Sequence, residues 1–141
     1  MKRILVVDDS ATMRALVVES LQQIAPDIKI TEAENGFEAL RALPRDAFDL
    51  IITDINMPDI NGLDLVSFVK SKPAYRTIPL VIVSTEGSER DLDRGVSLGA
   101  DAYVVKPFDP EDLRGIVTDL LECFEIAGRG AGKRWDDGSQ A

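Results

Sequence analysis

The stretch Leu50-Ile51-Ile52-Thr53-Asp54-Ile55-Asn56-Met57-Pro58 decides the fold. Its apolar and β-branched residues are typical of a strand buried on both faces of a sheet, which we predict over residues 49–53. Pro58 cannot continue a strand or a helix, so we expect a loop over residues 54–61. The segment therefore predicts that a buried strand delivers the carboxylate of Asp54 to one edge of a sheet.

Other polar residues also follow apolar runs. Asp8 and Asp9 come after residues 4–7, and Lys106 comes after residues 102–105. Ser84 and Thr85 follow residues 80–83 in the same way. Because ligands of open α/β folds bind at the carboxyl ends of parallel strands, we expect these residues to form one site at that edge.

Strand and helix patterns alternate along the chain. The strand around Ile28 and Ile30 alternates apolar and polar residues, which is typical of a half-buried strand at the edge of a sheet. With right-handed crossovers, the alternation predicts an α/β fold in which a five-stranded parallel sheet carries helices on both faces. The predicted strands are 3–7, 28–33, 49–53, 80–84 and 102–105. The first predicted helix follows Asp8-Asp9 and ends near residue 25, and the other predicted helices cover 37–43, 62–71, 88–98 and 110–124.

Two breaker residues bear on the predicted helices. Pro44 is expected to end the helix over 37–43. Gly95 lies in the middle of the helix over 88–98, where a glycine costs about 1 kcal/mol relative to alanine. We therefore expect the helix over 88–98 to be the least firmly held.

The composition is that of one acidic domain. The 141 residues include 25 acidic and 16 basic ones, a formal net charge of -9, which argues against direct nucleic-acid or anionic-membrane binding. We assign residues 1–126 to the folded domain, and residues 127–141, which lack apolar periodicity, to a flexible C-terminal tail. No apolar run approaches the ~20 residues of a membrane span, and no signal-peptide pattern is present, so a cytoplasmic location is expected.

The chain contains no histidine. It therefore cannot form a Ser-His-Asp triad, a histidine zinc site or a phosphohistidine of its own. If phosphoryl chemistry takes place here, the histidine involved has to come from a partner.

Three carboxylates, those of Asp8, Asp9 and Asp54, are expected to meet at the sheet edge. Like charges at close range repel strongly, so protonation or a cation has to neutralise them. Mg²⁺ suits such a site because it prefers a few carboxylate oxygens together with a carbonyl and waters. Taken alone, Asp8 and Asp9 could instead serve only to cap the first helix.

The same residues permit phosphoryl transfer. A carboxylate such as that of Asp54 can act as a nucleophile and form an aspartyl phosphate, with Lys106 supplying positive charge and Ser84 a hydroxyl donor. The backbone carbonyl of Asn56 lies close enough in sequence to serve the metal. The alternatives are a solvated lysine at 106 and a simple loop cap at Ser84; we interpret Asp59 as a solvated loop acid.

One set of separated residues, spread over about residues 2–124, resembles a known family: Asp8-Asp9, Asp54 with Met57-Pro58 and Gly62, Ser84, and Lys106-Pro107. That family is the receiver domains of two-component response regulators. The resemblance implies a flavodoxin-like doubly wound fold with strand order 2-1-3-4-5. It implies Mg²⁺ at Asp8, Asp9, Asp54 and the Asn56 carbonyl, and phosphorylation of Asp54 by a histidine kinase. Lys106 and Ser84 would contact the phosphoryl group, and the Lys106-Pro107 bond would be cis.

Within the family, residues 102–108 are similar to the stand-alone chemotaxis type. Tyr103 then corresponds to an aromatic switch residue, although it could be only a half-buried strand tyrosine. Thr85 is bulkier than the alanine of that type, so we expect it to affect access to the phosphoryl group. The implied function is a phosphorylation-activated signalling switch rather than a dedicated enzyme, with a target-binding face formed by residues 88–98, 102–105 and 110–124.

Other classes of protein share parts of this pattern. A Mg²⁺-dependent phosphohydrolase with an aspartate nucleophile carries a second aspartate two residues later, where this chain has Asn56. A nucleotide or flavin binder on the same fold is disfavoured because the loop after residue 7 lacks a glycine-rich phosphate turn. The chain could also be a receiver excised from a larger regulator.

Overall fold

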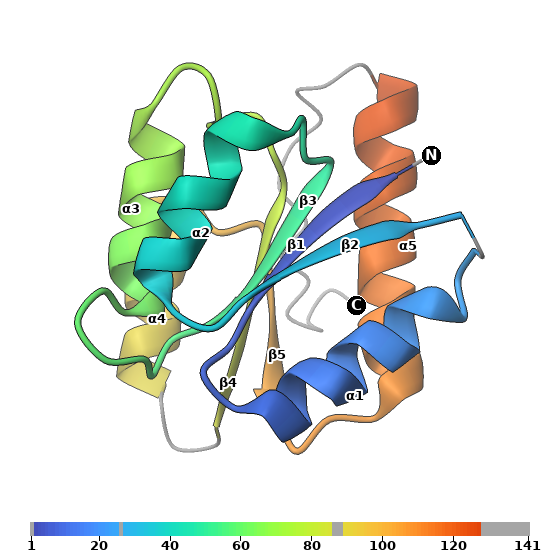
Figure 1. Ribbon diagram of the computed structural model, residues 1–141, viewed down its shortest axis with the longest axis horizontal. Helices are drawn as coiled ribbons and strands as arrows, with labels where there is room; N and C mark the ends of the chain where they lie inside the picture. The colour runs from blue at the N-terminus through green and yellow to red at the C-terminus, as the bar shows by residue number, and fades with distance from the viewer. Residues whose placement is uncertain (1, 26, 86–88, 128–141) are drawn as a thin grey trace.

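The computed structural model describes residues 2–25, 27–85 and 89–127. The predicted tail lies outside the described residues except for Ala127, and the side chain of Thr85 is outside them too. The structure is a five-stranded parallel sheet in the order β2-β1-β3-β4-β5, which confirms the predicted fold class and strand order (Figure 1). In chain order the elements are β1 (Arg3–Val7), α1 (Ala11–Gln22), β2 (Lys29–Ala33), α2 (Gly36–Ala42), a 3-10 turn (Leu43–Arg45), β3 (Leu50–Asp54), α3 (Gly62–Ser71), β4 (Leu80–Thr85), α4 (Glu89–Leu98), β5 (Ala102–Lys106) and α5 (Pro110–Ala127).

Helices cover both faces of the sheet. Helices α1 and α5 lie on one face, and α2, α3 and α4 lie on the other (Figure 1). Because side chains alternate along a strand, Ile4 and Val6 pack in the cluster under α1 and α5, whereas Leu5 and Val7 pack in the cluster under α2 and α3. All five residues of β3 are buried, as expected for the central strand.

Several boundaries differ from the predicted ones by a few residues. Helix α1 ends at Gln22 rather than near residue 25, and β3 runs from Leu50 to Asp54, so Asp54 is the last residue of the strand. Helix α2 covers Gly36–Ala42 rather than 37–43, and Pro44 sits in the 3-10 turn that follows, whose first positions tolerate a missing N–H. Strands β4 and β5 each extend one residue further than predicted, and α5 continues to Ala127.

The loop between β3 and α3 is closed tightly against the end of the strand. Asn61 accepts a hydrogen bond from the N–H of Asp64 at 2.9 Å, and Asp64 accepts one from the N–H of Asn61 at 3.2 Å, a reciprocal capping box that fixes the start of α3. A Cβ atom on Gly62 would overlap the carbonyl oxygen of Asp54. The glycine therefore lets the first turn of α3 approach the residue that ends β3.

Candidate functional site

Three carboxylates converge at the carboxyl edge of the sheet. Asp8 and Asp9 follow β1, and Asp54 ends the neighbouring strand β3. One ligand oxygen from each lies within 4.8 Å of the other two, with Asp8 and Asp54 buried and Asp9 exposed. The sequence placed these three residues at one edge, and the structure brings their side chains together there.

Lys106 joins this cluster from the end of β5. Its ammonium nitrogen lies 3.2 Å from Asp8 Oδ2 and 3.3 Å from Asp54 Oδ2. The lysine side chain is only 11% exposed, so it is not a solvated surface lysine. The Lys106–Pro107 peptide bond is cis, as the family resemblance implies.

Helix α1 is capped by Ser10 and not by Asp8 or Asp9. The Ser10 hydroxyl accepts a hydrogen bond from the N–H of Met13 at 3.2 Å. Asp8 instead holds the turn before the helix, because its Oδ1 accepts a hydrogen bond from the N–H of Ser10 at 2.9 Å. Its second oxygen is thereby left to face Lys106.

Arg14 supports the site in a way that the sequence did not reveal. Its guanidinium donates to the backbone carbonyl of Asp8 at 2.6 Å and to Glu32 at 3.1 Å. Arg14 lies one turn into α1, and Glu32 lies on β2. The only signal in the sequence is an arginine on the first turn after Asp8-Asp9, which is too common to identify by itself.

Burial dominates the electrostatics of Asp54. Removal from water raises the pKa of the Asp54 carboxyl above its usual value, and the nearby Asp8 carboxylate raises it further. Lys106 and the N–H of Ile55, which donates to Asp54 Oδ1 at 2.8 Å, act in the opposite direction. A cation placed among the three carboxylates would favour the ionised form of Asp54.

Ser84 is fully buried near the end of β4, the strand that lies between β3 and β5 in the sheet. In the sheet register Val83 is opposite Asp54, and Ser84 is the next residue. Its hydroxyl has no hydrogen-bond partner among the described residues. A buried hydroxyl without a partner costs about 1–3 kcal/mol, so an incoming acceptor oxygen would be stabilised there.

The remaining predicted residues lie around this cluster. Asn56 is exposed in the loop that follows β3, and Asp59 is an exposed loop acid with a positive φ of 63°. Tyr103 is half-buried on β5 and packs against the cluster under α2 and α3, and the register places it opposite Ile82. By strand alternation it faces the same side of the sheet as Ser84, away from the side of Lys106.

The donor set fits a hard divalent cation. All three converging side chains offer carboxylate oxygens, which Mg²⁺ prefers. Two of the carboxylates are buried beside a single lysine, so the cluster retains excess negative charge. Fold and cluster together define a doubly wound α/β domain that presents a buried aspartate within a group of acids that could hold a metal ion.

Comparisons with known proteins name this class. The sequence pattern of the response regulator receiver domain matches residues 4–118, so the chain belongs to the response regulator receiver domain family. It is 38% identical over 120 residues to the chemotaxis protein CheY homolog of Campylobacter jejuni, covering 84% of this chain and 92% of that protein. It is 40% identical over 113 residues to chemotaxis protein CheY1 of Helicobacter pylori, covering 79% and 90%.

Solved structures agree with this assignment. The chemotaxis response regulator CheY4 of Vibrio cholerae superposes with a TM-score of 0.77 at 34% identity, covering 85% of this chain and 98% of that one. Membership in the family makes the chain a phosphorylation-activated signalling switch. Among the helices of the described residues, none is both long and apolar enough to cross a membrane.

Proposed function

We propose that this receiver accepts a phosphoryl group on Asp54 from a phosphohistidine of a sensor kinase or phosphotransfer protein, with Mg²⁺ bound. The observation that carries the proposal is the convergence of three carboxylates, two of which contact the ammonium of Lys106, near a buried hydroxyl without a partner among the described residues. The cation would be held by four groups: the carboxylates of Asp8, Asp9 and Asp54 and the backbone carbonyl of Asn56. When bound, Mg²⁺ would neutralise carboxylate charge and bind phosphate oxygens at its open positions.

The transfer step uses the carboxylate of Asp54 as nucleophile. A carboxylate oxygen attacks phosphorus, a P–O bond forms, the P–N bond to the partner's histidine breaks, and the electron pair leaves on the imidazole nitrogen. Lys106 opposes the effect of burial and so helps to keep Asp54 ionised for this attack. After transfer its ammonium lies close enough to pair with the phosphoryl oxygens.

The switch step links this site to the α4 side of the sheet. The Ser84 hydroxyl donates to a phosphoryl oxygen, which draws the end of β4 toward Asp54. Tyr103 lies on the same side of the sheet as Ser84, one strand over, and responds to that movement. We propose α4, β5 and α5 as the face that binds the downstream target.

The extent of the domain, its location in the cell and its biological role belong to the same proposal. The folded receiver continues through α5, which ends at Ala127, and acts in the cytoplasm; the rest of the predicted tail lies outside the described residues. The chain is a phosphoacceptor and not a dedicated enzyme: Asn56 stands where an aspartate-nucleophile phosphohydrolase would carry its second acid. The similarity to chemotaxis proteins of Campylobacter jejuni and Helicobacter pylori supports a role in chemotaxis.

A labelling experiment tests the acceptor. Acetyl phosphate with Mg²⁺ should give a phosphoryl adduct detected by intact mass spectrometry, and Asp54→Asn should abolish it because an amide is a far poorer nucleophile. Asp59→Asn is the matched control, since Asp59 is an exposed acid in the same loop region and asparagine tolerates its positive φ. Undiminished label on Asp54→Asn would mean that another residue is the acceptor.

A second experiment tests the output face. Beryllium fluoride mimics the phosphoryl group, so its addition should shift the NMR signals of α4, β5 and α5. If the signals of these elements did not move, the proposed face would be wrong.

A further inference from the structure

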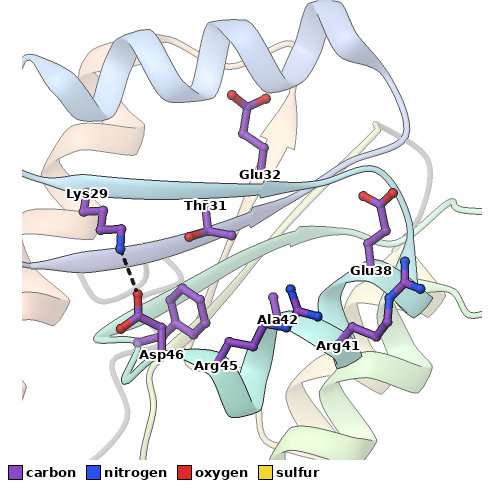
Figure 2. Close-up of a pocket in the computed structure, with 9 residues that line it drawn as sticks. Lys29, Thr31, Glu32, Glu38, Arg41, Ala42, Arg45 and Asp46 are labelled. Atoms are coloured by element: carbon purple, nitrogen blue, oxygen red, sulfur yellow. Dashed lines mark hydrogen bonds and ion pairs between the residues drawn. The ribbon is translucent and has the colours of Figure 1, made fainter.

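The outer strand β2 borders a hollow that the phosphoacceptor site does not use (Figure 2). The hollow has a volume of about 390 Å³ and lies between β2, α2 and the 3-10 turn. Phe48 and Ala42 give it an apolar part. The same hollow is lined by six charged residues: Lys29, Glu32, Glu38, Arg41, Arg45 and Asp46.

The acids of this hollow are already engaged within the protein. Asp46 pairs with Lys29 at 3.4 Å, drawn as a dashed line in Figure 2, and with Arg3 at 3.1 Å. Glu32 pairs with Arg14 at 3.1 Å. Glu38 accepts the backbone N–H of Glu34 at 2.8 Å. An incoming group would therefore meet acids that have internal partners.

Two arginines at this hollow, Arg41 and Arg45, lack the internal partners that its acids have. Both are exposed, and within the described part of the chain neither guanidinium has a hydrogen bond or an ion pair. They are four residues apart, at the end of α2 and in the turn that follows it, and Figure 2 shows both beside Ala42. Of the six charged side chains at this hollow, those of Arg41 and Arg45 alone have neither a hydrogen bond nor an ion pair among the described residues, and two unpartnered guanidiniums favour an acidic ligand.

The backbone of β2 is also open on this side. Among the described residues, strand β2 pairs with β1 and with no other strand. The N–H of Lys29 donates to the carbonyl of Lys2, and the carbonyl of Ala33 accepts from the N–H of Asp8, so these peptide groups point toward β1. Because the direction alternates along a strand, the N–H groups of Ile30 and Glu32 point to the open edge. An extended chain could pair with them.

We propose that this edge binds an extended acidic segment of a partner protein as a sixth strand next to β2. Backbone hydrogen bonds to Ile30 and Glu32 would fix the segment, and its carboxylates would pair with Arg41 and Arg45. An apolar side chain of the segment packs against Ala42 and Phe48. Strand β2 and the proposed output strand β5 lie at opposite edges of the sheet, so this site is separate from the output face.

Fluorescence anisotropy tests the proposal on the full chain. The probe is a labelled peptide that presents glutamate, valine and glutamate at alternate positions, so that all three face the hollow, with threonine at the positions between them. It is compared with a peptide in which glutamine replaces each glutamate. We expect the glutamate peptide to bind, and Arg41→Glu with Arg45→Glu to weaken it by about tenfold or more, because each reversal replaces an attraction with a repulsion. Arg76→Glu, at an exposed arginine in the α3–β4 loop, is the matched control and should leave the affinity unchanged.

Hydrogen exchange tests the backbone part. In the complex the amides of Ile30 and Glu32 should gain protection, whereas those of the buried strand β3 should not change. Equal binding of the glutamine peptide, full affinity in the double arginine variant, or no added protection at Ile30 and Glu32 would overturn the proposal. Competition by inorganic phosphate at equal concentration, or dimerisation of the chain through β2, would also overturn it.

This site does not depend on the proposed phosphoacceptor. Asp54→Asn should bind the peptide as well as the unchanged chain does. The double arginine variant should still be labelled by acetyl phosphate, which keeps failure of the one proposal distinct from failure of the other. Loss of peptide binding in Asp54→Asn would contradict the separation of the two sites.

Discussion

The ammonium of Lys106 lies 3.3 Å from the carboxylate of Asp54, although the two residues come from strands that are not neighbours. Strand β4 separates β3 from β5 in the sheet, and Lys106 spans it at the carboxyl edge. The same ammonium contacts Asp8, which follows the strand beyond β3. A phosphoryl group on Asp54 would compete with these carboxylates for the lysine, so its arrival would redistribute charge across the whole edge.

Lys106→Ala should therefore affect signalling more than metal binding. Removing the ammonium leaves all three carboxylates in place, so Mg²⁺ affinity measured by calorimetric titration should change by less than about tenfold or increase. The NMR shifts that beryllium fluoride induces on α4 and β5 should be largely lost. Lys72→Ala, at an exposed lysine, should change neither. Complete loss of metal binding in Lys106→Ala would contradict the role we give this residue.

Asp54 should destabilise the metal-free fold at neutral pH. Burial raises the pKa of the Asp54 carboxyl in the folded protein above its value in the unfolded chain. The contribution of Asp54 to stability is therefore fully present at a pH below the unfolded-state pKa, and it is lost as the pH rises through the folded-state pKa. Asp54→Asn does not ionise and avoids this loss. With EDTA present, its melting temperature should exceed that of the unchanged chain by roughly 2–8 °C at pH 7 and by less at pH 4.

The control for this prediction is again Asp59→Asn, whose exposed position should give no pH-dependent difference in melting temperature. Adding Mg²⁺ should stabilise the unchanged chain more than Asp54→Asn, because the variant has lost a carboxylate ligand. An equal difference between Asp54→Asn and the unchanged chain at both pH values would show that burial does not perturb this carboxyl.

Much of the fold could be predicted because its signals are local. An apolar run such as residues 50–53 identifies a buried strand, and the polar residue after it marks the functional edge. The convergence of Asp8, Asp9 and Asp54 then follows from parallel topology alone. The strand order came from the family resemblance, since nothing in the alternation of elements specifies which strands are neighbours.

The parts that could not be predicted depend on packing between distant segments. From the sequence we interpreted Gly95 only as a weak point in a helix. In the structure Gly95 is buried, and a Cβ atom at this position would overlap Cδ1 of Ile82. The sequence also contained no indication that Arg14 supports the Asp8 carbonyl or that Asp101 is buried. Each of these contacts depends on the register between elements, which residue spacing alone does not determine.

Gly95→Ala should destabilise the protein by about 1–3 kcal/mol, because the added methyl group must displace Ile82 on β4. Gly115→Ala in α5 is the matched control: nothing lies within 4 Å of its Cβ position, so the better helix propensity of alanine should be neutral or stabilising by up to about 1 kcal/mol. Urea unfolding measures both. Ile82→Val removes the clashing methyl group and should restore part of the loss; equal effects at the two glycines would contradict the packing argument.

The amino edge of the sheet carries a buried ion pair of its own. Lys70 on α3 donates to Asp101 at 3.0 Å and to the carbonyls of Arg76 and Ile78 at 3.2 and 2.7 Å. The same oxygen of Asp101 accepts the N–H of Leu80 at 2.9 Å. One carboxylate therefore ties the start of β4 to α3, with the side chains of Lys70 and Asp101 only 13% and 8% exposed.

Asp101→Asn should cost about 3–5 kcal/mol in the free energy of unfolding, because it leaves a buried ammonium without its counter-charge. The exposed Asp93→Asn on α4 is the control and should stay within about 0.5 kcal/mol of the unchanged chain. Lys70→Met combined with Asp101→Asn removes both charges, so the double variant should be more stable than Asp101→Asn alone. Urea unfolding of the unchanged chain, Lys70→Met, Asp101→Asn and the double variant measures the coupling, and strictly additive losses would show that the two residues do not stabilise the fold as a pair. Since this pair lies at the edge opposite Asp54, labelling of Asp54 by acetyl phosphate should persist in every variant that remains folded.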